Sequence, residues 1–247
     1  MSDPDSTTSA PDTQHSAHPI RLGLFGGSFN PIHNGHLAIA RKAHEILALD
    51  RTLFIPTGDP PHKQDRALAP AHHRYEMARL AIADTPGFEL SDIEIARQGK
   101  SYSIDTVREL QRQYGPTTSL FFLIGLDAFL DLPSWREPDA LLAACSFVVI
   151  SRPGQSFQSL TTLPFLRHVT PNQLAPLDTG ALDRLDLLLP SGHRIICLPL
   201  PPSPISASDI RHRIQRGAML ANLLPPPVES YILRQQLYRE NQHRTHI

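Results

Sequence analysis

The sequence predicts an α/β fold: a doubly wound, Rossmann-like parallel sheet with a small C-terminal helical piece. Short apolar runs alternate with segments of helical periodicity along most of the 247 residues. Several of these runs, residues 119–124 among them, are apolar at almost every position. Strands that are apolar on both faces are typical of a parallel sheet covered by helices on both sides.

In the first half of the chain, helix and strand signals alternate. Residues 20–25 form an apolar strand that ends at two glycines, and apolar residues then recur at helical spacing over residues 34–49. Residues 52–56 are a second buried strand, ended by a proline. Pro70 is expected in the first turn of the next helix, where a missing N–H costs nothing. The alternation over residues 88–95 predicts one bent strand or the arm of a hairpin.

In the second half, residues 103–114 form a clear helix, for which Gly115 is a stop signal. We also predict strands at residues 119–124, 145–150 and 195–198, and a short helix at residues 137–144. Residues 151–192 contain several prolines and broken periodicity, which predicts a variable connection with one or two short helices. Residues 205–238 are expected to form two helices joined by residues 222–227.

The composition is that of an ordinary globular protein with a polar extension at its N-terminus. Hydrophobic residues make up 40% and charged residues 19%, and a net charge of −1 argues against a nucleic-acid partner. Residues 1–18 are rich in Ser, Thr, Asp, Pro and Ala, which predicts a disordered tail without an export signal. We expect residues 19–204 to form the α/β domain and residues 205–240 a C-terminal helical subdomain.

The lengths of the apolar segments and the positions of the cysteines indicate in which cellular compartment the protein is expected. No apolar run reaches the roughly 18 residues of a membrane span, so we expect a cytoplasmic protein with no membrane partner. Cys145 and Cys197 lie in apolar, strand-like runs and are expected to be buried, inert thiols. The sequence leaves the oligomeric state open, a homo-oligomer included.

The most specific motif, GGSFNPIHNGH, joins the first strand to the first helix at residues 26–36, where doubly wound folds bind phosphates. Gly26 and Gly27 let the backbone approach a ligand without a Cβ in the way. His33 and His36 are three residues apart, so both rings are expected on one side of the helix start, beside N–H groups that attract anions. Two imidazole donors there form an electrophilic clamp for a phosphate oxygen.

Simpler interpretations of this motif stay open. A Gly-Gly turn with two surface histidines needs no function, and a His-x-x-His pair can bind zinc, although the sequence offers no convincing third ligand. Gly35 leaves room for a base or ribose against the backbone. The string is not GxGxxG, and it lacks the Gly-Lys-Ser/Thr ending of a P-loop. We predict no dedicated protein metal site.

A second motif, ISASDIR, opens the C-terminal helices at residues 205–211. Ser206 is a fitting N-cap with Asp209 as its capping-box partner, an interpretation that needs no ligand. The same geometry also presents the hydroxyls of Ser206 and Ser208 to a triphosphate, and Arg211 adds a fixed charge. We expect the two motifs to form anion sites at opposite ends of one sheet.

Both motifs are similar to the signatures of the adenylyltransferase-type nucleotidyltransferases, (His/Thr)-x-Gly-His and Ile-Ser-x-(Thr/Ser)-x-x-Arg. Class I aminoacyl-tRNA synthetases share a related His-rich signature, but they are much longer and carry a lysine-rich second motif that we do not find. Over about residues 21–239 the chain resembles the bacterial nicotinate-nucleotide adenylyltransferases. The matching stretches are PTGDPPHK (56–63), SYSIDTV (101–107), FFLIGLDAF (121–129), LPSW (132–135), SRPG (151–154) and the ending LLPPPVESYILRQQLYR. The related pantetheine-phosphate adenylyltransferases lack the LPSW and RPG segments.

The resemblance implies a reaction and a set of site residues. The reaction joins ATP and nicotinate mononucleotide into nicotinate adenine dinucleotide and pyrophosphate, a step of NAD biosynthesis, with Mg²⁺ travelling with ATP. The implied catalytic residues are His33, His36 and Arg211. The implied ATP-binding residues are Gly26, Gly27, Ser28, Phe29, Gly35, Gly125, Asp127, Ile205, Ser206 and Ser208. The implied substrate-binding residues are Lys63, Tyr102, Ser103 and Trp135.

The resemblance also implies individual roles. Trp135 would stack on the pyridine ring, and backbone N–H groups near Ser103 would meet its carboxylate. Lys63 would reach phosphates, and Asp127 the adenosine side. A core tryptophan, a solvated loop lysine and a helix-capping aspartate are the simpler interpretations of these residues. Arg136 stands where many relatives have tyrosine, and a cation there would favour nicotinate over neutral nicotinamide.

Three alternatives remain at this point. The acceptor could be nicotinamide mononucleotide or 4′-phosphopantetheine, or the chain could be a non-catalytic nucleotide-binding regulator. The two histidines and Arg211 count against a regulator, because a sensor does not need charges aimed at a transition state.

Overall fold

The computed structural model describes residues 19–60, 68–151, 153–201 and 204–239. Within them, seven strands form one sheet in the order β3-β2-β1-β4-β5-β7-β6. The strands are β1 (Arg21–Gly27), β2 (Arg51–Pro56), β3 (Phe88–Leu90), β4 (Ser119–Gly125), β5 (Ser146–Ile150), β6 (Leu185–Leu188) and β7 (Arg194–Leu198). All neighbouring pairs are parallel except β6 with β7. The predicted doubly wound α/β class is confirmed.

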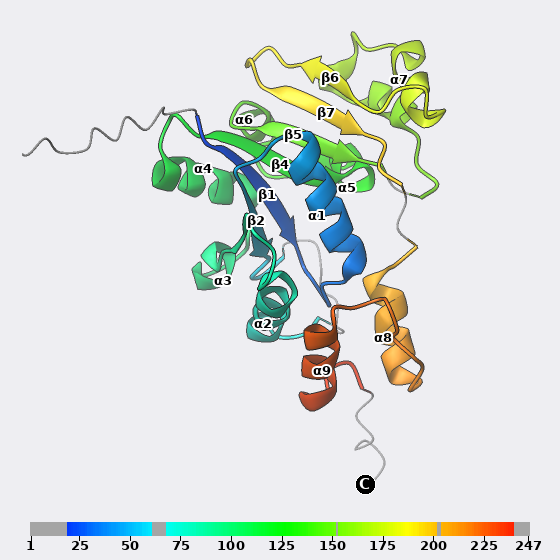
Figure 1. Ribbon diagram of the computed structural model, residues 1–247. Helices are drawn as coiled ribbons and strands as arrows, with labels where there is room; N and C mark the ends of the chain where they lie inside the picture. The colour runs from blue at the N-terminus through cyan, green and yellow to red at the C-terminus, as the bar shows by residue number, and fades with distance from the viewer. Residues whose placement is uncertain (1–18, 61–67, 152, 202–203, 240–247) are drawn as a thin grey trace, which may run out of the picture.

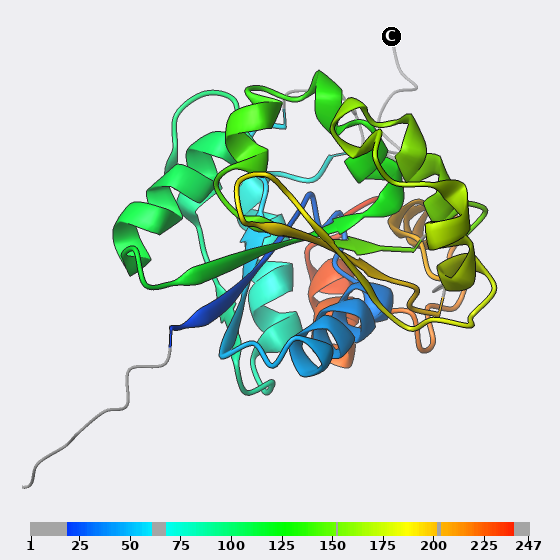
Figure 2. The ribbon, with the colours of Figure 1, turned by 90° about the horizontal axis from the view of Figure 1, so that it is seen from above.

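Helices cover both faces of the sheet (Figures 1 and 2). The helices are α1 (Asn34–Ile46), α2 (Ala71–Ile82), α3 (Ile93–Ala96), α4 (Ser103–Tyr114), α5 (Leu126–Leu130), α6 (Pro138–Leu142), α7 (Pro171–Asp178), α8 (Ala207–Gln215) and α9 (Pro226–Arg234). Three short 3-10 turns, η1 (Leu132–Ser134), η2 (Phe157–Thr162) and η3 (Pro164–Leu166), complete the set. Side chains of α1, α2, α8 and α9 share one hydrophobic cluster, and those of α3 to α7 share the other. The C-terminal helices therefore pack on the same core as the sheet.

The strand order reverses direction between β1 and β4. From β1 the chain winds through β2 to β3 on one side, and β4, β5 and β7 then extend the sheet on the other. In open parallel sheets, ligands bind beyond the carboxyl ends of the strands at such a switch point. The first motif follows β1, and the FFLIGLDAF stretch leaves β4 at the same edge.

Two expected elements differ from the structure. Residues 88–95 do not form one strand or a hairpin arm: β3 is short, and Ile93–Ala96 is a helical turn. The backbone N–H groups of Ile95 and Ala96 donate to the carbonyl of Asp92, at 2.7 and 2.8 Å. The isoleucines alternate as in a strand, but local hydrogen bonds of the turn replace those of a ladder.

The variable connection over residues 151–192 also contains an element that was not expected. Besides the predicted short helices it holds β6, which pairs antiparallel with β7. A four-residue edge strand leaves too short an alternation to be recognised in sequence. Smaller differences are that α1 ends at Ile46 instead of residue 49, and that Pro70 is the N-cap of α2 and not its first helical residue.

Both cysteines are fully buried free thiols. Burial raises the pKa of Cys145 and raises that of Cys197 to about 12. The expectation that both thiols are buried is confirmed. Separately, none of the described helices has the length and apolar content needed to cross a bilayer.

Candidate active site

The loop between β1 and α1 is shaped by one buried aromatic side chain. Phe29 is 2% exposed and has a left-handed φ of 43°. Its ring packs edge-on against Phe25 and His36, at centroid distances of 5.7 and 5.3 Å. Among the described residues outside its two chain neighbours, no atom lies within 4 Å of the place that a Cβ on Gly26 would take. The backbone thus turns around Phe29 while Gly26 borders open space, as the motif predicts for a close ligand approach.

His33 and His36 cap the helix α1 reciprocally. The backbone N–H of His36 donates to Nδ1 of His33, and the N–H of His33 donates to Nδ1 of His36, both at 3.3 Å. The two rings stack with their centroids 3.7 Å apart. A neutral imidazole whose Nδ1 accepts a hydrogen bond carries its proton on Nε2. The cap therefore selects the tautomer in which both histidines are Nε2–H donors, and the expected placement of both rings on one side is confirmed.

The second motif lies against the first and not at the opposite end of the sheet. Arg211, in α8, donates from Nη1 to the backbone carbonyl of Asn30 at 2.8 Å. Its Nη2 lies 3.3 Å from Oγ of Ser208. Because α8 follows β7 across the carboxyl edge, its first turn reaches the loop after β1 (Figure 1). The two anion-binding motifs form one continuous surface, which corrects the sequence expectation.

The first turn of α8 is capped by Ser206 alone. Oγ of Ser206 accepts from the N–H of Asp209 at 3.1 Å, as predicted. The Asp209 carboxylate, however, accepts from Arg213 at 2.7 Å instead of completing a capping box. Ile205, directly before the cap, packs against the cluster on this face of the sheet. The serine hydroxyls and Arg211 are thereby fixed on a rigid helix start.

The segment after α8 ties back to the start of α1. Asn34 donates from its backbone N–H to the carbonyl of Leu223 and from Nδ2 to that of Asn222, both at 2.9 Å. The Tyr238 hydroxyl donates to Oδ1 of Asn30 at 2.8 Å, and burial raises the pKa of this tyrosine. The last part of the described chain therefore closes on the phosphate loop.

A buried arginine that the sequence analysis missed lies beneath this loop. Arg74 on α2 is 1% exposed and donates three hydrogen bonds to backbone carbonyls. They go from Nε to Ala69 at 2.9 Å, from Nη1 to Ser28 at 2.9 Å and from Nη2 to Gly58 at 3.1 Å. Desolvation lowers the pKa of this guanidinium. No local sequence pattern marks Arg74, because its partners come from two different loops, the one after β1 and the one between β2 and α2.

The residues expected to bind the second substrate gather around the start of α4. Tyr102 is the N-cap of α4, and Ser103 is its first residue. The guanidinium of Arg136 lies 4.7 Å from the centre of the Tyr102 ring. Trp135 is half-buried and contacts Phe122 edge-on, with centroids 6.4 Å apart. The structure therefore brings Tyr102, Ser103 and the Trp135–Arg136 pair together at one place.

Of the remaining predicted residues, all but Lys63 lie in the described part of the chain. Gly125 ends β4, and Asp127 lies in the first turn of α5, at the carboxyl edge next to β1. Gly35 is buried in the first turn of α1. Lys63 lies outside the described residues. Apart from Lys63, the sequence-predicted site residues thus line one edge of the sheet.

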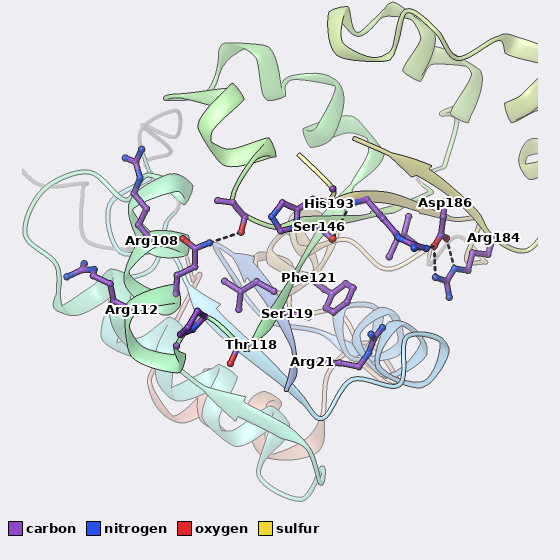
Figure 3. A pocket seen from close by; sticks show the side chains of 18 residues that line it. Arg21, Arg108, Arg112, Thr118, Ser119, Phe121, Ser146, Arg184, Asp186 and His193 are labelled. Atoms are coloured by element: carbon purple, nitrogen blue, oxygen red, sulfur yellow. Dashed lines mark hydrogen bonds and ion pairs between the residues drawn. The ribbon is translucent and has the colours of Figure 1, made fainter. Parts of the chain in front are cut away.

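A cavity lies elsewhere, at the amino ends of the strands. Its volume is about 1160 Å³, and it is bordered by the first residues of β4, β5 and β7. Several arginines line this cavity. In Figure 3, Arg108 and Arg112 lie on one side of it and Arg184 lies on the other. Arg184 also pairs with Asp186 at 2.6 Å. These cations diverge instead of converging on one point, so we place the candidate active site at the opposite, carboxyl edge.

The chemistry of the carboxyl edge suits phosphate oxygens. Its donors are two Nε2–H groups, the Arg211 guanidinium and the N-terminal turns of α1 and α8. Preorganised N–H groups and helix N-termini stabilise anions. Over the described chain, no group of three or more His, Cys, Asp or Glu side chains could hold a metal ion.

Comparisons with known proteins agree with this geometry. Residues 24–213 match the family model described as cytidylyltransferase-like. A Citrifermentans bemidjiense protein named probable nicotinate-nucleotide adenylyltransferase is 43% identical over 221 residues, covering 89% of this chain and 98% of that protein. A Moorella thermoacetica protein of the same name is 39% identical, covering 90% and 93%.

A solved structure also supports the fold. It is the Plasmodium falciparum nicotinic acid mononucleotide adenylyltransferase complexed with NaAD, with a TM-score of 0.66 at 18% identity. The alignment covers 89% of this chain and 97% of that one. From the family match over most of its length and relatives near 40% identity, we conclude that the chain belongs to the nicotinate-nucleotide adenylyltransferase family.

Proposed function

We propose that this chain transfers the adenylyl group of ATP to nicotinate mononucleotide, giving nicotinate adenine dinucleotide and pyrophosphate. The observation that carries the proposal is the contact between the two phosphate motifs at the switch point of the sheet. One surface there offers two imidazole N–H donors, a guanidinium and two helix starts. A triphosphate is the ligand whose charge and length match such a row of donors.

The reaction needs positioning more than proton transfer. A 5′-phosphate oxygen of the mononucleotide attacks the α-phosphorus of ATP, and the bond from that phosphorus to the bridging oxygen breaks. The electron pair leaves with pyrophosphate. The attacking phosphate is already an anion, so no general base is required, and we expect no covalent enzyme intermediate.

Each motif stabilises negative charge on a different part of the triphosphate. His33 and His36 donate from Nε2 to oxygens around the α-phosphate, in the tautomer that their capping bonds select. Ser206, Ser208 and Arg211 bind the β- and γ-phosphates, which become the leaving group. The charge that builds up on the leaving oxygen is thus met by donors already in place.

Mg²⁺ is the expected companion of ATP. The donor set at the site consists of N–H groups and a guanidinium, which bind phosphate oxygens and not a cation. Mg²⁺ usually keeps several waters and is held through substrate phosphates, so it fits this site as part of the ATP complex. When bound, it neutralises phosphate charge.

The start of α4 accounts for the choice of nicotinate. The backbone N–H groups of Ser103 and Ile104 form no hydrogen bond within the described residues. They point from the helix N-terminus beside Tyr102, Trp135 and the positive charge of Arg136. A carboxylate on a stacked pyridine ring satisfies these donors, whereas a neutral amide gains less from the charge.

A direct assay tests the proposal. Purified protein is incubated with ATP, Mg²⁺ and either nicotinate or nicotinamide mononucleotide, and pyrophosphate and dinucleotide are measured over time. We expect release with a strong preference for the nicotinate form. Equal rates would overturn the specificity, and release only with 4′-phosphopantetheine would replace the acceptor. Nucleotide binding without any product would reject an enzyme in favour of a regulator.

A further inference from the structure

Arg74 connects backbone segments that belong to both substrate regions. Its buried guanidinium holds the carbonyls of Ser28, Gly58 and Ala69. Ser28 lies in the phosphate loop after β1, and Gly58 lies in the loop after β2. Within the described chain this cation forms no ion pair, so its charge is met by carbonyl dipoles. A planar guanidinium can reach three carbonyls in three directions because its donors form a rigid fork.

The Gly58 segment continues the connection toward the pyridine side. The next residue, Asp59, pairs with Ser101 through two hydrogen bonds: Asp59 N–H to Ser101 Oγ at 3.2 Å, and Ser101 N–H to the Asp59 carbonyl at 2.9 Å. Ser101 directly precedes the Tyr102–Ser103 turn. Hydrogen bonds, connected by the chain at Gly58–Asp59 and Ser101–Tyr102, therefore link the loop after β1 through Arg74 to the Tyr102–Ser103 turn.

The segment around Gly58 is also closely packed on its other side. A Cβ placed on Gly58 would come 2.1 Å from the carbonyl oxygen of Glu94. Gly58 is thus held between the backbone of α3 and the fork of Arg74. On the ATP side, Oδ1 of Asn30 accepts from the N–H of Ala69 at 3.0 Å, which joins the same two loops a second time. Additional contacts therefore hold both the Gly58 segment and the loop after β1 in place.

We propose that Arg74 is a positioning residue that fixes the distance between the loop after β1, which contains Ser28, and the Tyr102–Ser103 turn. The inference rests on the proposed function, because the spacing matters only if two substrates must meet in line. Arg74 touches neither substrate and acts through the backbone of Ser28 and Gly58. A misplacement of about 1 Å between reacting groups can cost on the order of 100-fold in rate.

The test compares R74K with M77A. Lysine keeps the charge but cannot hold three divergent carbonyls. Met77 is fully buried one turn further along α2, so M77A removes packing from the same helix and leaves the guanidinium in place. For R74K we expect kcat to fall about 10- to 100-fold, with each KM changed by less than about threefold. M77A should lower the melting temperature while kcat stays within about twofold of the parent protein.

Hydrogen–deuterium exchange provides a readout that does not depend on activity. In R74K, exchange should rise together in residues 26–30, 57–60 and 101–104, whereas M77A should leave these segments protected. If the unmodified protein makes no dinucleotide but R74K shows this exchange pattern, the proposed function fails and the structural link stands. An equal loss of kcat in R74K and M77A, or unchanged exchange in R74K, would overturn the inference.

Should R74K fail to fold, S101A takes its place. Ser101 is buried and its Oγ accepts from the Asp59 N–H, so alanine removes one of the two hydrogen bonds of the next step and leaves Arg74 intact. We expect kcat to fall about three- to tenfold, with both KM values unchanged. A kcat equal to that of the parent protein would contradict the positioning role.

Discussion

Nη1 of Arg211 donates a 2.8 Å hydrogen bond to the backbone carbonyl of Asn30, 181 residues earlier in the chain. This contact places the guanidinium beside the loop whose histidines cap α1. A bond to a neutral backbone carbonyl orients the guanidinium without neutralising its positive charge. The arginine can therefore orient on the protein and still attract a phosphate.

His36→Asn tests the donor role of Nε2 without removing the helix cap. Oδ1 of asparagine can replace Nδ1 as the acceptor of the His33 N–H, but asparagine offers no donor at the Nε2 position. Loss of one oxyanion donor costs on the order of 10²–10³ in rate, so we expect kcat to fall by at least that factor. Steady-state kinetics and circular dichroism provide the measurement. A folded protein with less than tenfold loss would remove His36 from the catalytic residues.

Arg211→Gln should weaken the leaving-group side of the site. The variant loses the fixed charge next to Ser208, and we expect kcat/KM for ATP to fall about tenfold or more. The matched control is Arg213→Gln on the same helix, which removes a cation already paired with Asp209. Initial rates over a range of ATP concentrations distinguish the two. Equal losses would show that general charge, and not the place of Arg211, matters.

Arg136→Ala should reduce the preference for nicotinate over nicotinamide mononucleotide. Arg136 is exposed and lies over Tyr102, and its carboxylate partners Asp105 and Glu137 lie 3.7 and 3.8 Å away. Because solvent screens exposed charges, we expect the ratio of the two kcat/KM values to shift only about three- to tenfold. Arg108→Ala, which removes a nearby cation paired with Glu137, is the control. Unchanged discrimination in Arg136→Ala would refute a role in specificity.

Glu94→Gln should stabilise the protein at neutral pH but not in acid. Burial raises the pKa of Glu94, so the folded state binds this proton more tightly than the unfolded state. Stability from that proton is complete below the ordinary glutamate pKa of about 4.3 and is lost as the pH rises through the raised value. Glutamine can still accept from the Thr106 hydroxyl, a 2.9 Å bond in the native protein. The melting-temperature difference between variant and parent should grow from pH 4 to pH 7, and a constant difference would contradict this.

Sequence patterns captured the layers of the fold because most strands are apolar on both faces and helices end at recognisable signals. Helix α4 begins and ends where its periodicity and Gly115 indicated. The short edge strand β6 carried no comparable signal. The turn Ile93–Ala96 mimics strand alternation, so only its hydrogen bonds reveal it.

The candidate site shows the same division. Motifs indicated His33, His36 and Arg211, because their chemistry is local and their spacing is distinctive. The supporting contacts made by Asn30 and Arg74 join residues far apart in the chain. Asn30 lies within the first motif but its partners do not, and Arg74 belongs to no pattern of charges or periodicity, so only the folded arrangement could identify these contacts.

The hydrogen bonds from Asn34 to Asn222 and Leu223, together with that from Arg211 to Asn30, join segments that are synthesised far apart in time. The phosphate loop leaves the ribosome among the first structured residues, and its partners are among the last. A nascent chain that has completed β7 still lacks Arg211, because α8 follows this strand in the chain. The donors of the second motif are therefore added to the site only after all seven strands of the described sheet have been synthesised.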